Sequence, residues 1–403
     1  MGSIIRLRLG ALELEWGKND MFDRRHSALF LPSDIAKAHY YYADGVVEEK
    51  PAFVRRLRST VRRLELLGYT LQDCRKLYEE GIATTPDYYP APVLTFEEFA
   101  RVLRNVNVTA VQLPEDGDYD LGEYVARAIF ADPEFTKTES RLGSLTDEDG
   151  TFFENLDPYI PLRLLAENPE NLDQDIVWTF ADIVEGGWAS EDELYEGVPD
   201  ENRWLIVTEG SSDSAILRQS VVLVAPDVAD FFEFVDMSEN YPFTGTGNLL
   251  RFCQGLARIK IQNRILVVLD NDTAGHDAYC RIQRLDLPRR MSVSLLPDLE
   301  ECRRVKTLGP SGAQYEDVNG RALSIEWFLD TSIPGTPEPT VRWTAYNAQL
   351  DAYQGELVDK EAYTRHFFAT VKRCAVHDWP KLARLWDQLL ASCTTSIADR
   401  RPK

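Results

Sequence analysis

The fold of the second half of this chain is decided by two short stretches, WLIVTEG at residues 204–210 and ILVVLDND at residues 265–272. Each begins with a short apolar run, which is typical of a buried strand, and each run is followed by one or two acidic residues. Similar apolar runs, and helical patterns between them, complete the region; the runs cover residues 231–235 and 291–296, and the helical patterns cover 212–222, 247–258 and 274–285. Strands that alternate with helices predict a mostly parallel α/β sheet.

Acidic residues stand at the ends of two predicted strands. Glu209 follows the strand at 204–208, and Asp270 and Asp272 follow the strand at 264–269. Ligand sites in open α/β sheets form at the carboxyl ends of strands, and residues two apart on an extended segment point the same way. If the strands are neighbours, the three carboxylates face one ion, which predicts a Mg²⁺ or Mn²⁺ site. An Asp-x-Asp pair alone is common in acidic proteins. A strand that ends in Glu-Gly, followed later by a strand that ends in Asp-x-Asp before a helix, is a much more specific sign of a metal site.

The order of these motifs resembles a known fold. IVTEGSSD at residues 206–213 and LDNDTAG at residues 269–275 are similar to the TOPRIM fold of primases, topoisomerases and OLD-type nucleases. Other stretches resemble bacterial HEPN/Toprim-associated proteins: MGS at 1–3, LELEWGKN at 12–19, TLGPSG at 307–312, DVNG at 317–320 and SIE at 324–326. The resemblance implies an N-terminal HEPN/Toprim-associated domain at 1–200, a Rossmann-like TOPRIM domain at 201–335 and a C-terminal helical region at 336–403.

The resemblance also implies roles for individual acids. Glu209, Asp270 and Asp272 correspond to metal-binding and catalytic acids, and Asp213 and Glu326 correspond to ligands of a second metal. Two ions ~3.5–4 Å apart would clamp the attacking and leaving oxygens of a phosphodiester. From the residues alone, Asp213 serves equally well as a cap at the positive end of a helix, and Glu326 as an acid on a solvated helix face.

Basic and glycine-rich segments are candidates for contact with phosphate. The glycine loops at 245–248 and 309–312 would present backbone N–H groups, unless they are plain turns. Lys306 is the nearest candidate for a basic catalytic group. Clustered arginines in an acidic chain predict a phosphate track, and ion pairs with the abundant acids are the alternative. The candidate phosphate-binding residues are Gly245, Gly247, Asn248, Arg281, Arg284, Arg303, Arg304, Ser311, Gly312, Arg55, Arg58 and Arg62.

Elsewhere the patterns predict local structure. Residues 3–16 alternate around Gly10, which predicts a β-hairpin whose Arg and Glu faces pair across the strands. Residues 51–82 are predicted to be helical, starting near Pro51 and interrupted at Gly68. Residues 132–200 are predicted to mix short helices with loops. Further helices are predicted at 95–107, 120–131, 344–354, 359–374 and 380–392.

Composition narrows the class of protein. The net charge of −22 argues against indiscriminate coating of nucleic acid, and six cysteines without zinc-ligand spacing argue against a zinc-ribbon primase. No apolar run approaches the ~18–20 residues that span a bilayer, and the N-terminus does not resemble a signal peptide. We therefore expect a cytoplasmic protein without a membrane partner. Arg373 and His377 miss the spacing of a HEPN ribonuclease by one position, so no HEPN chemistry is expected.

These observations favour a Mg²⁺- or Mn²⁺-dependent TOPRIM endonuclease whose partner is DNA or RNA. The resemblance implies phage defence or a toxin-like effector, with a homodimer or a defence-system protein as partner. Strand passage and primer synthesis are disfavoured, because the chain is short and lacks zinc cysteines. The alternative is a non-catalytic module that binds metal and nucleic acid, or a nucleotide, as a sensor or scaffold. No obvious catalytic lysine or histidine stands beside the acids, which keeps this alternative open.

Overall fold

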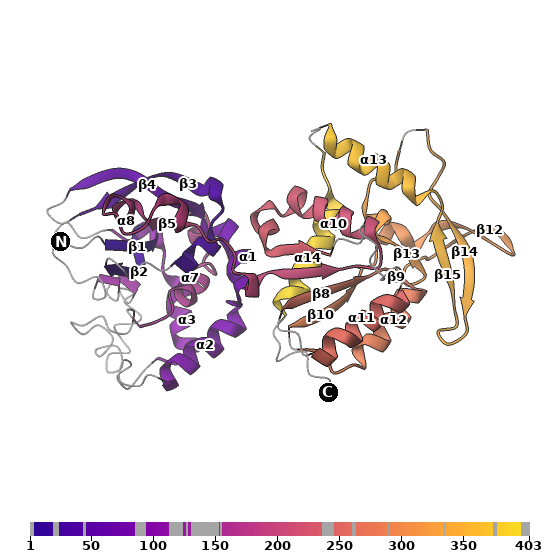
Figure 1. Cartoon of the computed structure of the whole chain (residues 1–403), viewed down its shortest axis with the longest axis horizontal. Coiled ribbons are helices and arrows are strands. Elements are labelled where there is room, and N and C mark those ends of the chain that lie inside the picture. The colour runs from indigo at the N-terminus through magenta and orange to yellow at the C-terminus, as the bar shows by residue number, and fades with distance from the viewer. Residues whose placement is uncertain are drawn as a thin grey trace. The chain divides into compact units, whose positions relative to one another are not determined.

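The computed structural model divides into two compact units, Met1–Pro199 and Asp200–Lys403 (Figure 1). The structure describes residues 4–18, 24–42, 46–84, 94–112, 124–125, 128–129, 153, 155–235, 246–259, 263–288, 290–333, 335–373 and 377–395. None of the helices in these ranges is long and apolar enough to cross a membrane.

The first unit is built on a five-stranded antiparallel sheet in the order β2-β1-β5-β4-β3. β1 and β2 form the predicted hairpin: Gly10 adopts a φ of +59° at its turn, and Arg6 pairs with Glu13 across the strands at 3.2 Å. β5 arrives from far along the chain and inserts between β1 and β4. The strands are β1 (Ile4–Leu9), β2 (Leu12–Lys18), β3 (Ile35–Tyr41), β4 (Val47–Arg56) and β5 (Asp175–Thr179).

The helix predicted at 51–82 is wrong at its start. Residues 51–56 belong to β4, which pairs with β3 on one side and with β5 on the other. This pairing buries Phe53 in the sheet, and Pro51 therefore lies in a strand and not in a first helical turn. Gly68 interrupts the helical region as predicted, with a φ of +103° that ends the first helix. The two helices are α1 (Leu57–Leu67) and α2 (Leu71–Thr84).

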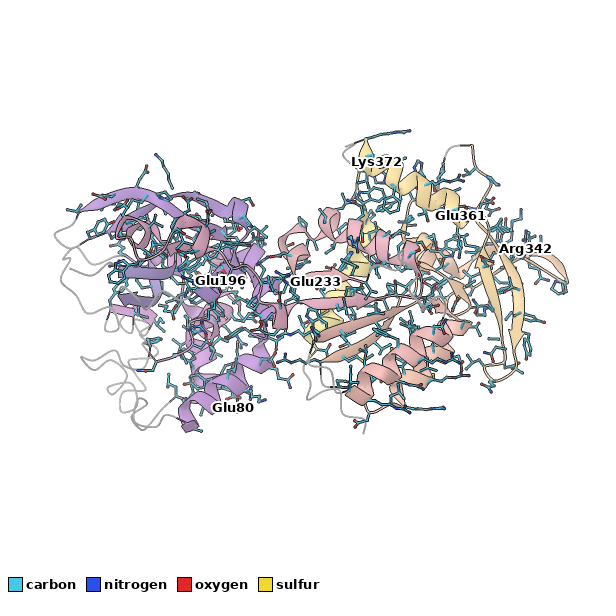
Figure 2. All side chains as sticks on the ribbon, viewed as in Figure 1. Glu80, Glu196, Glu233, Arg342, Glu361 and Lys372 are labelled. Carbon is cyan, nitrogen blue, oxygen red and sulfur yellow. The ribbon has the colours of Figure 1, made fainter. Side chains whose placement is uncertain are left out.

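The core of the first unit is built from buried side chains of the sheet and its helices, which Figure 2 draws as sticks on the ribbon. Trp178 on β5 and Phe53 on β4 are fully buried and stack with their ring centroids 5.3 Å apart. α3 (Phe96–Asn105) begins at a capping box formed by Thr95 and Glu98, which confirms the helix predicted at 95–107. The aromatic pair stabilises the packing of β4 against β5, and the capping box satisfies backbone N–H groups at the start of α3.

The segment predicted to mix short helices with loops, 132–200, is described mainly from residue 155 onward. It contains α7 (Tyr159–Leu165), α8 (Ala181–Glu185) and α9 (Glu191–Leu194), and also β5, the central strand of the sheet. The helix predicted at 120–131 lies largely outside the described residues. Short 3-10 helices cover Arg24–Leu29, Pro32–Asp34, Val108–Ala110 and Pro169–Asn171.

The second unit is built on a parallel four-stranded sheet in the order β10-β8-β6-β7. Its strands coincide with the four apolar runs of the sequence, and the predicted helices lie between them. The strands are β6 (Trp204–Val207), β7 (Phe232–Phe234), β8 (Arg264–Leu269) and β10 (Met291–Leu295). The helices are α10 (Ser211–Val224), α11 (Thr246–Ile259) and α12 (Thr273–Gln283). The predicted parallel α/β sheet is confirmed.

Helices cover both faces of this parallel sheet (Figure 1). On one face, α11 and α12 pack against alternate β8 residues such as Val267, with Leu249 and Ile282 in the same cluster. On the other face, α14 (Pro380–Thr394) packs beside α10, where the buried Trp386 donates a hydrogen bond to Ser220 Oγ at 2.7 Å. Burial on both faces explains why β8 is a continuous apolar run and not an alternating one.

The chain after β10 builds a second sheet in the order β12-β11-β14-β15. Its strands are β11 (Val305–Gly309), β12 (Gly312–Glu316), β14 (Thr340–Asn347) and β15 (Ala352–Leu357). A two-stranded sheet joins β9 (Asn271–Asp272) to β13 (Ala322–Leu323). 3-10 helices cover Asp200–Asn202, Pro226–Phe231, Glu300–Arg303 and Ile325–Phe328.

The helix predicted at 344–354 is wrong, because these residues form the turn and parts of both strands of the β14–β15 hairpin. A bulge between Trp343 and Ala345 shifts the alternation of the first strand, so its period of two is hidden in the sequence. The helices predicted at 359–374 and 380–392 are confirmed as α13 (Lys360–Lys372) and α14.

Candidate functional site

The acids that end the two predicted strands lie side by side. β6 and β8 are hydrogen-bonded neighbours in the parallel sheet, so Glu209 and Asp270 emerge at the same edge. The backbone N–H of Asp270 donates to Glu209 Oε1 at 3.4 Å. Asp272 follows in β9 and caps the start of α12. The condition on which the three-carboxylate site depended, that β6 and β8 are neighbours, is therefore met.

The loop around Asp272 is held by two kinds of contact. Its Oδ1 accepts from the Gly275 N–H at 2.7 Å, and its Oδ2 accepts from Gln354 Nε2 on β15. A side chain at position 275 would collide with the carbonyl oxygen of Asp270, so the glycine of this motif is required for the close turn. Gln354 Oε1 also accepts from Ala274 N–H at 2.9 Å, which ties β15 to the same loop.

Asp213 and Glu326 come from different elements. Asp213 lies in the first turn of α10 and accepts hydrogen bonds from the Gly210 N–H at 3.1 Å and from Ser212 Oγ at 3.2 Å. It therefore has the geometry of a helix cap. Glu326 lies in the 3-10 helix after β13 and is only 3% exposed, so the alternative of a solvated helix face is wrong. Its Oε2 accepts from Ser324 Oγ at 2.6 Å.

Electrostatics show that these acids form one cluster. Burial, with the charges of Asp272 and Asp213, raises the pKa of Glu209 to about 8. Burial and the charge of Glu326 raise the pKa of Asp213 to about 6. Burial raises the pKa of Asp270 well above its usual value, and all four other carboxylates add to this effect. We name Glu209, Asp213, Asp270, Asp272 and Glu326 the carboxylate cluster. Its members come from three segments of the chain that are far apart in sequence, at residues 209–213, 270–272 and 326.

One cation acts on this cluster from the start of α13. Burial works against the charge of Lys360, but nearby carboxylates outweigh it and raise its pKa. The carboxylates that do so belong to Glu326, Glu356, Asp270 and Asp213. Lys360 Nζ also pairs with Glu356 Oε1 at 3.6 Å. The sequence contained no signal for this residue, because it lies far along the chain from Asp272 and follows the hairpin that was predicted to be a helix.

The carboxylate cluster has the donor chemistry of a hard divalent cation, since all its ligand atoms are carboxylate oxygens. Among the described residues, however, no three Asp, Glu, His or Cys side chains are already arranged so that they could hold an ion. Asp213 and Asp272 instead accept hydrogen bonds from backbone N–H groups. The residues therefore fit Mg²⁺ or Mn²⁺ in chemistry, and ligation requires their side chains to rotate.

A protein-family model described as HEPN/Toprim N-terminal domain 1 matches residues 1–202, just over half of the 403 residues. The chain belongs to the HEPN/Toprim-associated family. No curated protein and no solved structure matches it. The matched region ends before β6, so it contains no member of the carboxylate cluster. The assignment of the cluster in this HEPN/Toprim-associated protein therefore rests on its geometry.

The glycine segments of the HEPN/Toprim-associated protein lie at ordinary structural positions. Gly247 and Asn248 lie in the first turn of α11, and Gly245 lies outside the described residues. Ser311 and Gly312 lie at the exposed turn of the β11–β12 hairpin, where Gly312 adopts a φ of +90°. This second segment has the geometry of a plain turn.

Most candidate arginines of the second unit lie beside acids or rings. Arg281 pairs with Asp277 at 2.8 Å, Arg303 pairs with Glu300 at 3.0 Å, and the guanidinium of Arg304 lies 5.5 Å from the Tyr315 ring centroid. Arg284 caps the end of α12, and Lys306 lies half-buried on β11. The cation that acts on the carboxylate cluster is Lys360.

The candidate arginines of the first unit do not form the single helical track that was expected. Arg55 lies on β4, is buried, and pairs with Asp34 at 2.7 Å. Arg58 pairs with Asp173 at 2.9 Å, and Arg62 is exposed on α1. The placement of Arg55 corrects the expectation, because the strand β4 extends through the first part of the predicted helix.

Proposed function

We propose that this HEPN/Toprim-associated protein is a divalent-metal-dependent nuclease that hydrolyses phosphodiester bonds of DNA or RNA. The observation that carries the proposal is that Glu209 and Asp270 follow neighbouring parallel strands and are joined by the Asp270 N–H, while the charges of Asp213, Asp272, Glu326 and Lys360 act on the same place. Half-buried like charges destabilise a fold unless cations offset them, and such clusters are therefore typical of functional sites. Carboxylate oxygens are the ligands that Mg²⁺ and Mn²⁺ prefer.

In this proposal Glu209, Asp270 and Asp272 hold one ion, and Asp213 and Glu326 hold a second. The bound ions would supply a nucleophilic water near neutral pH and offset the charge of the phosphodiester. The Lys360 side chain contributes a positive charge beside the same carboxylates, where it attracts the phosphate and orients the substrate strand. Gln354 orients Asp272 through its hydrogen bond, in the way that outer groups position metal ligands.

One observation favours a second candidate function, a non-catalytic sensor or scaffold that binds metal and nucleic acid. Asp213 and Asp272 are already bonded to backbone N–H groups at the starts of two helices. Both therefore have a structural role that requires no chemistry. A binding module would use the carboxylate cluster and Lys360 to bind metal and nucleic acid, and would not cleave the nucleic acid.

Cleavage of plasmid DNA and total cellular RNA in Mn²⁺ separates the two functions. The wild-type protein is compared with Glu209→Gln and with Glu233→Gln, which changes an exposed glutamate on β7 of the same sheet. The nuclease proposal expects cleavage by the wild type and by Glu233→Gln, and none by Glu209→Gln. No cleavage by the wild type, with Mn²⁺ binding intact by calorimetry, would establish the sensor instead. Absence of Mn²⁺ binding would refute both functions.

A further inference from the structure

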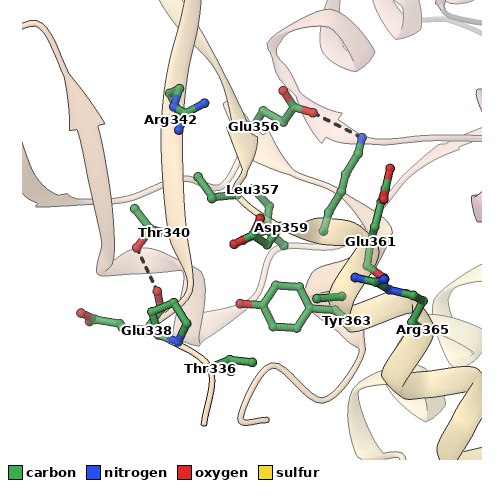
Figure 3. Close-up of a pocket in the computed structure, with 14 residues that line it drawn as sticks. Thr336, Glu338, Thr340, Arg342, Glu356, Leu357, Asp359, Glu361, Tyr363 and Arg365 are labelled. Atoms are coloured by element: carbon green, nitrogen blue, oxygen red, sulfur yellow. Dashed lines mark hydrogen bonds and ion pairs between the residues drawn. The ribbon is translucent and has the colours of Figure 1, made fainter. Parts of the chain in front are cut away.

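A cavity of about 510 Å³ opens between the start of α13 and the strands β14 and β15 (Figure 3). Its volume is within the range of about 300–1,000 Å³ that is common for small-ligand sites. The wall contains apolar surface from residues such as Leu357 and Ala362, together with charged side chains. The cavity therefore offers both apolar and charged surface to a ligand.

Tyr363 is the most informative residue of the wall. It is only 4% exposed, and Figure 3 shows its hydroxyl pointing into the cavity. No hydrogen bond joins this hydroxyl to another residue in the described part of the chain, and its oxygen is not among the buried side-chain atoms that lack a partner, so it is accessible from the cavity. Burial and the charge of Asp359 raise the pKa of Tyr363, so the hydroxyl keeps its proton and remains a donor. The hydroxyl is therefore a donor that a ligand in the cavity can reach.

Two guanidinium groups accompany this hydroxyl. Arg342 on β14 lines the cavity, and none of the described residues forms an ion pair or side-chain hydrogen bond with it. Arg365 on α13 also lines it, and its Nε donates to Glu361 O at 3.3 Å. Figure 3 shows Arg342 and Arg365 on either side of the hollow. Arginines in this position bind phosphate oxygens, because the guanidinium presents a planar set of donors.

Lys360 connects the cavity to the carboxylate cluster. Its side chain lines the cavity and pairs with Glu356, and its charge also interacts with Asp213, Asp270 and Glu326. A ligand in the cavity therefore lies next to the cation that serves the proposed metal site.

We propose that this cavity binds one nucleotide of the substrate strand, adjacent to the phosphodiester that the carboxylate cluster would cleave. Arg342 and Arg365, on either side of the hollow, contact the phosphates that flank this nucleotide, and the Tyr363 hydroxyl contacts its sugar or base. Carboxylates in the wall accept hydrogen bonds from sugar hydroxyls or base amino groups; they are Glu338, Glu356, Asp359 and Glu361. The inference deepens the proposed nuclease function and rests on it for the identity of the strand.

The test is binding of short fluorescein-labelled single-stranded RNA and DNA, measured by anisotropy in Ca²⁺ and compared with cleavage in Mn²⁺. Tyr363→Phe removes only the hydroxyl, and Arg342→Gln removes only the charge. The matched control is Arg373→Gln, which changes an exposed arginine at the far end of α13. We expect Tyr363→Phe to weaken binding about 2- to 10-fold and Arg342→Gln about tenfold or more, with the control unchanged. Thermal unfolding checks that each variant is folded.

The outcomes separate the cavity from the nuclease proposal. Metal-dependent cleavage by the wild type, with binding unchanged in folded Tyr363→Phe and Arg342→Gln, would overturn the cavity proposal alone. Binding that depends on both residues, without cleavage under any metal, would overturn the nuclease and retain a nucleotide site. A competition arm uses free adenosine monophosphate. Binding of the mononucleotide could depend on Tyr363 and Arg342 while binding of the oligonucleotides does not. In that case the cavity binds a free nucleotide, and its assignment to the substrate strand is refuted.

Discussion

Replacing Glu209 with glutamine is expected to stabilise the metal-free protein at alkaline pH, although it removes a proposed ligand. The pKa of Glu209 rises from 4.5 to about 8, chiefly through burial and then through the neighbouring acids. A carboxyl group with a raised folded-state pKa contributes stability at low pH and loses it as the pH rises from 4.5 through about 8. The neutral amide keeps the shape of the side chain and does not lose a proton.

The size of this effect follows from the displacement of the pKa. From 4.5 to about 8, it corresponds to roughly 5 kcal/mol if the full difference acts on folding. Glu209 is partly exposed and shares its repulsion with four other acids, so we expect about 2 kcal/mol at pH 8.5. For a unit of this size, 2 kcal/mol corresponds to an increase in Tm of about 4–8 °C.

Calorimetric unfolding in EDTA at pH 5 and pH 8.5 measures the effect, with Glu233→Gln as the control. The stabilisation by Glu209→Gln is expected to be larger at the higher pH, and the control is expected to stay within about 0.5 kcal/mol of wild type. Addition of Mn²⁺ is expected to reverse the order, because only the wild type gains stability from bound metal. A lower Tm for Glu209→Gln in EDTA at pH 8.5 would refute the reasoning, as would equal Mn²⁺ stabilisation of both proteins.

Three further changes test other parts of the structure. Asp272→Asn keeps a cap for the Gly275 N–H but sets an amide NH₂ against the Gln354 Nε2 donor, so the unfolding free energy in EDTA should fall by about 1–3 kcal/mol while Mn²⁺ binding by calorimetry is lost. Trp386→Ala empties a fully buried site and is expected to lower the unfolding free energy by about 3–5 kcal/mol in urea titration. Burial opposes the charge of Glu15, but hydrogen bonding and the charge of His26 lower its pKa. Glu15→Gln should therefore destabilise by about 1–2 kcal/mol at pH 7, and this difference should shrink as the pH falls below 4.5.

The sequence by itself determined the parallel sheet of the second unit and the three acids at its edge. Its strands are continuous apolar runs, because helices cover both faces of the sheet, and such runs are visible without knowledge of the partners. Glu209 and Asp270 could be placed because each follows a predicted strand and parallel neighbours end at the same edge, and Asp272 because it stands two residues after Asp270. The β1–β2 hairpin was equally local, since its alternation and its glycine turn lie within 15 residues, from Ile4 to Lys18.

Only the tertiary structure decided which segments that are far apart in sequence pack against one another. β5 (Asp175–Thr179) pairs with β1 (Ile4–Leu9) from a distant part of the chain, and no local sequence pattern identifies its partner strands. Its pairing with β4 also turned the start of a predicted helix into a strand. Glu326 and Lys360 reach the carboxylate cluster through β13 and the β14–β15 hairpin, whose bulge hid the strand period. Sequence periodicity reports which face of an element is buried, whereas the partner that buries it is chosen by long-range packing.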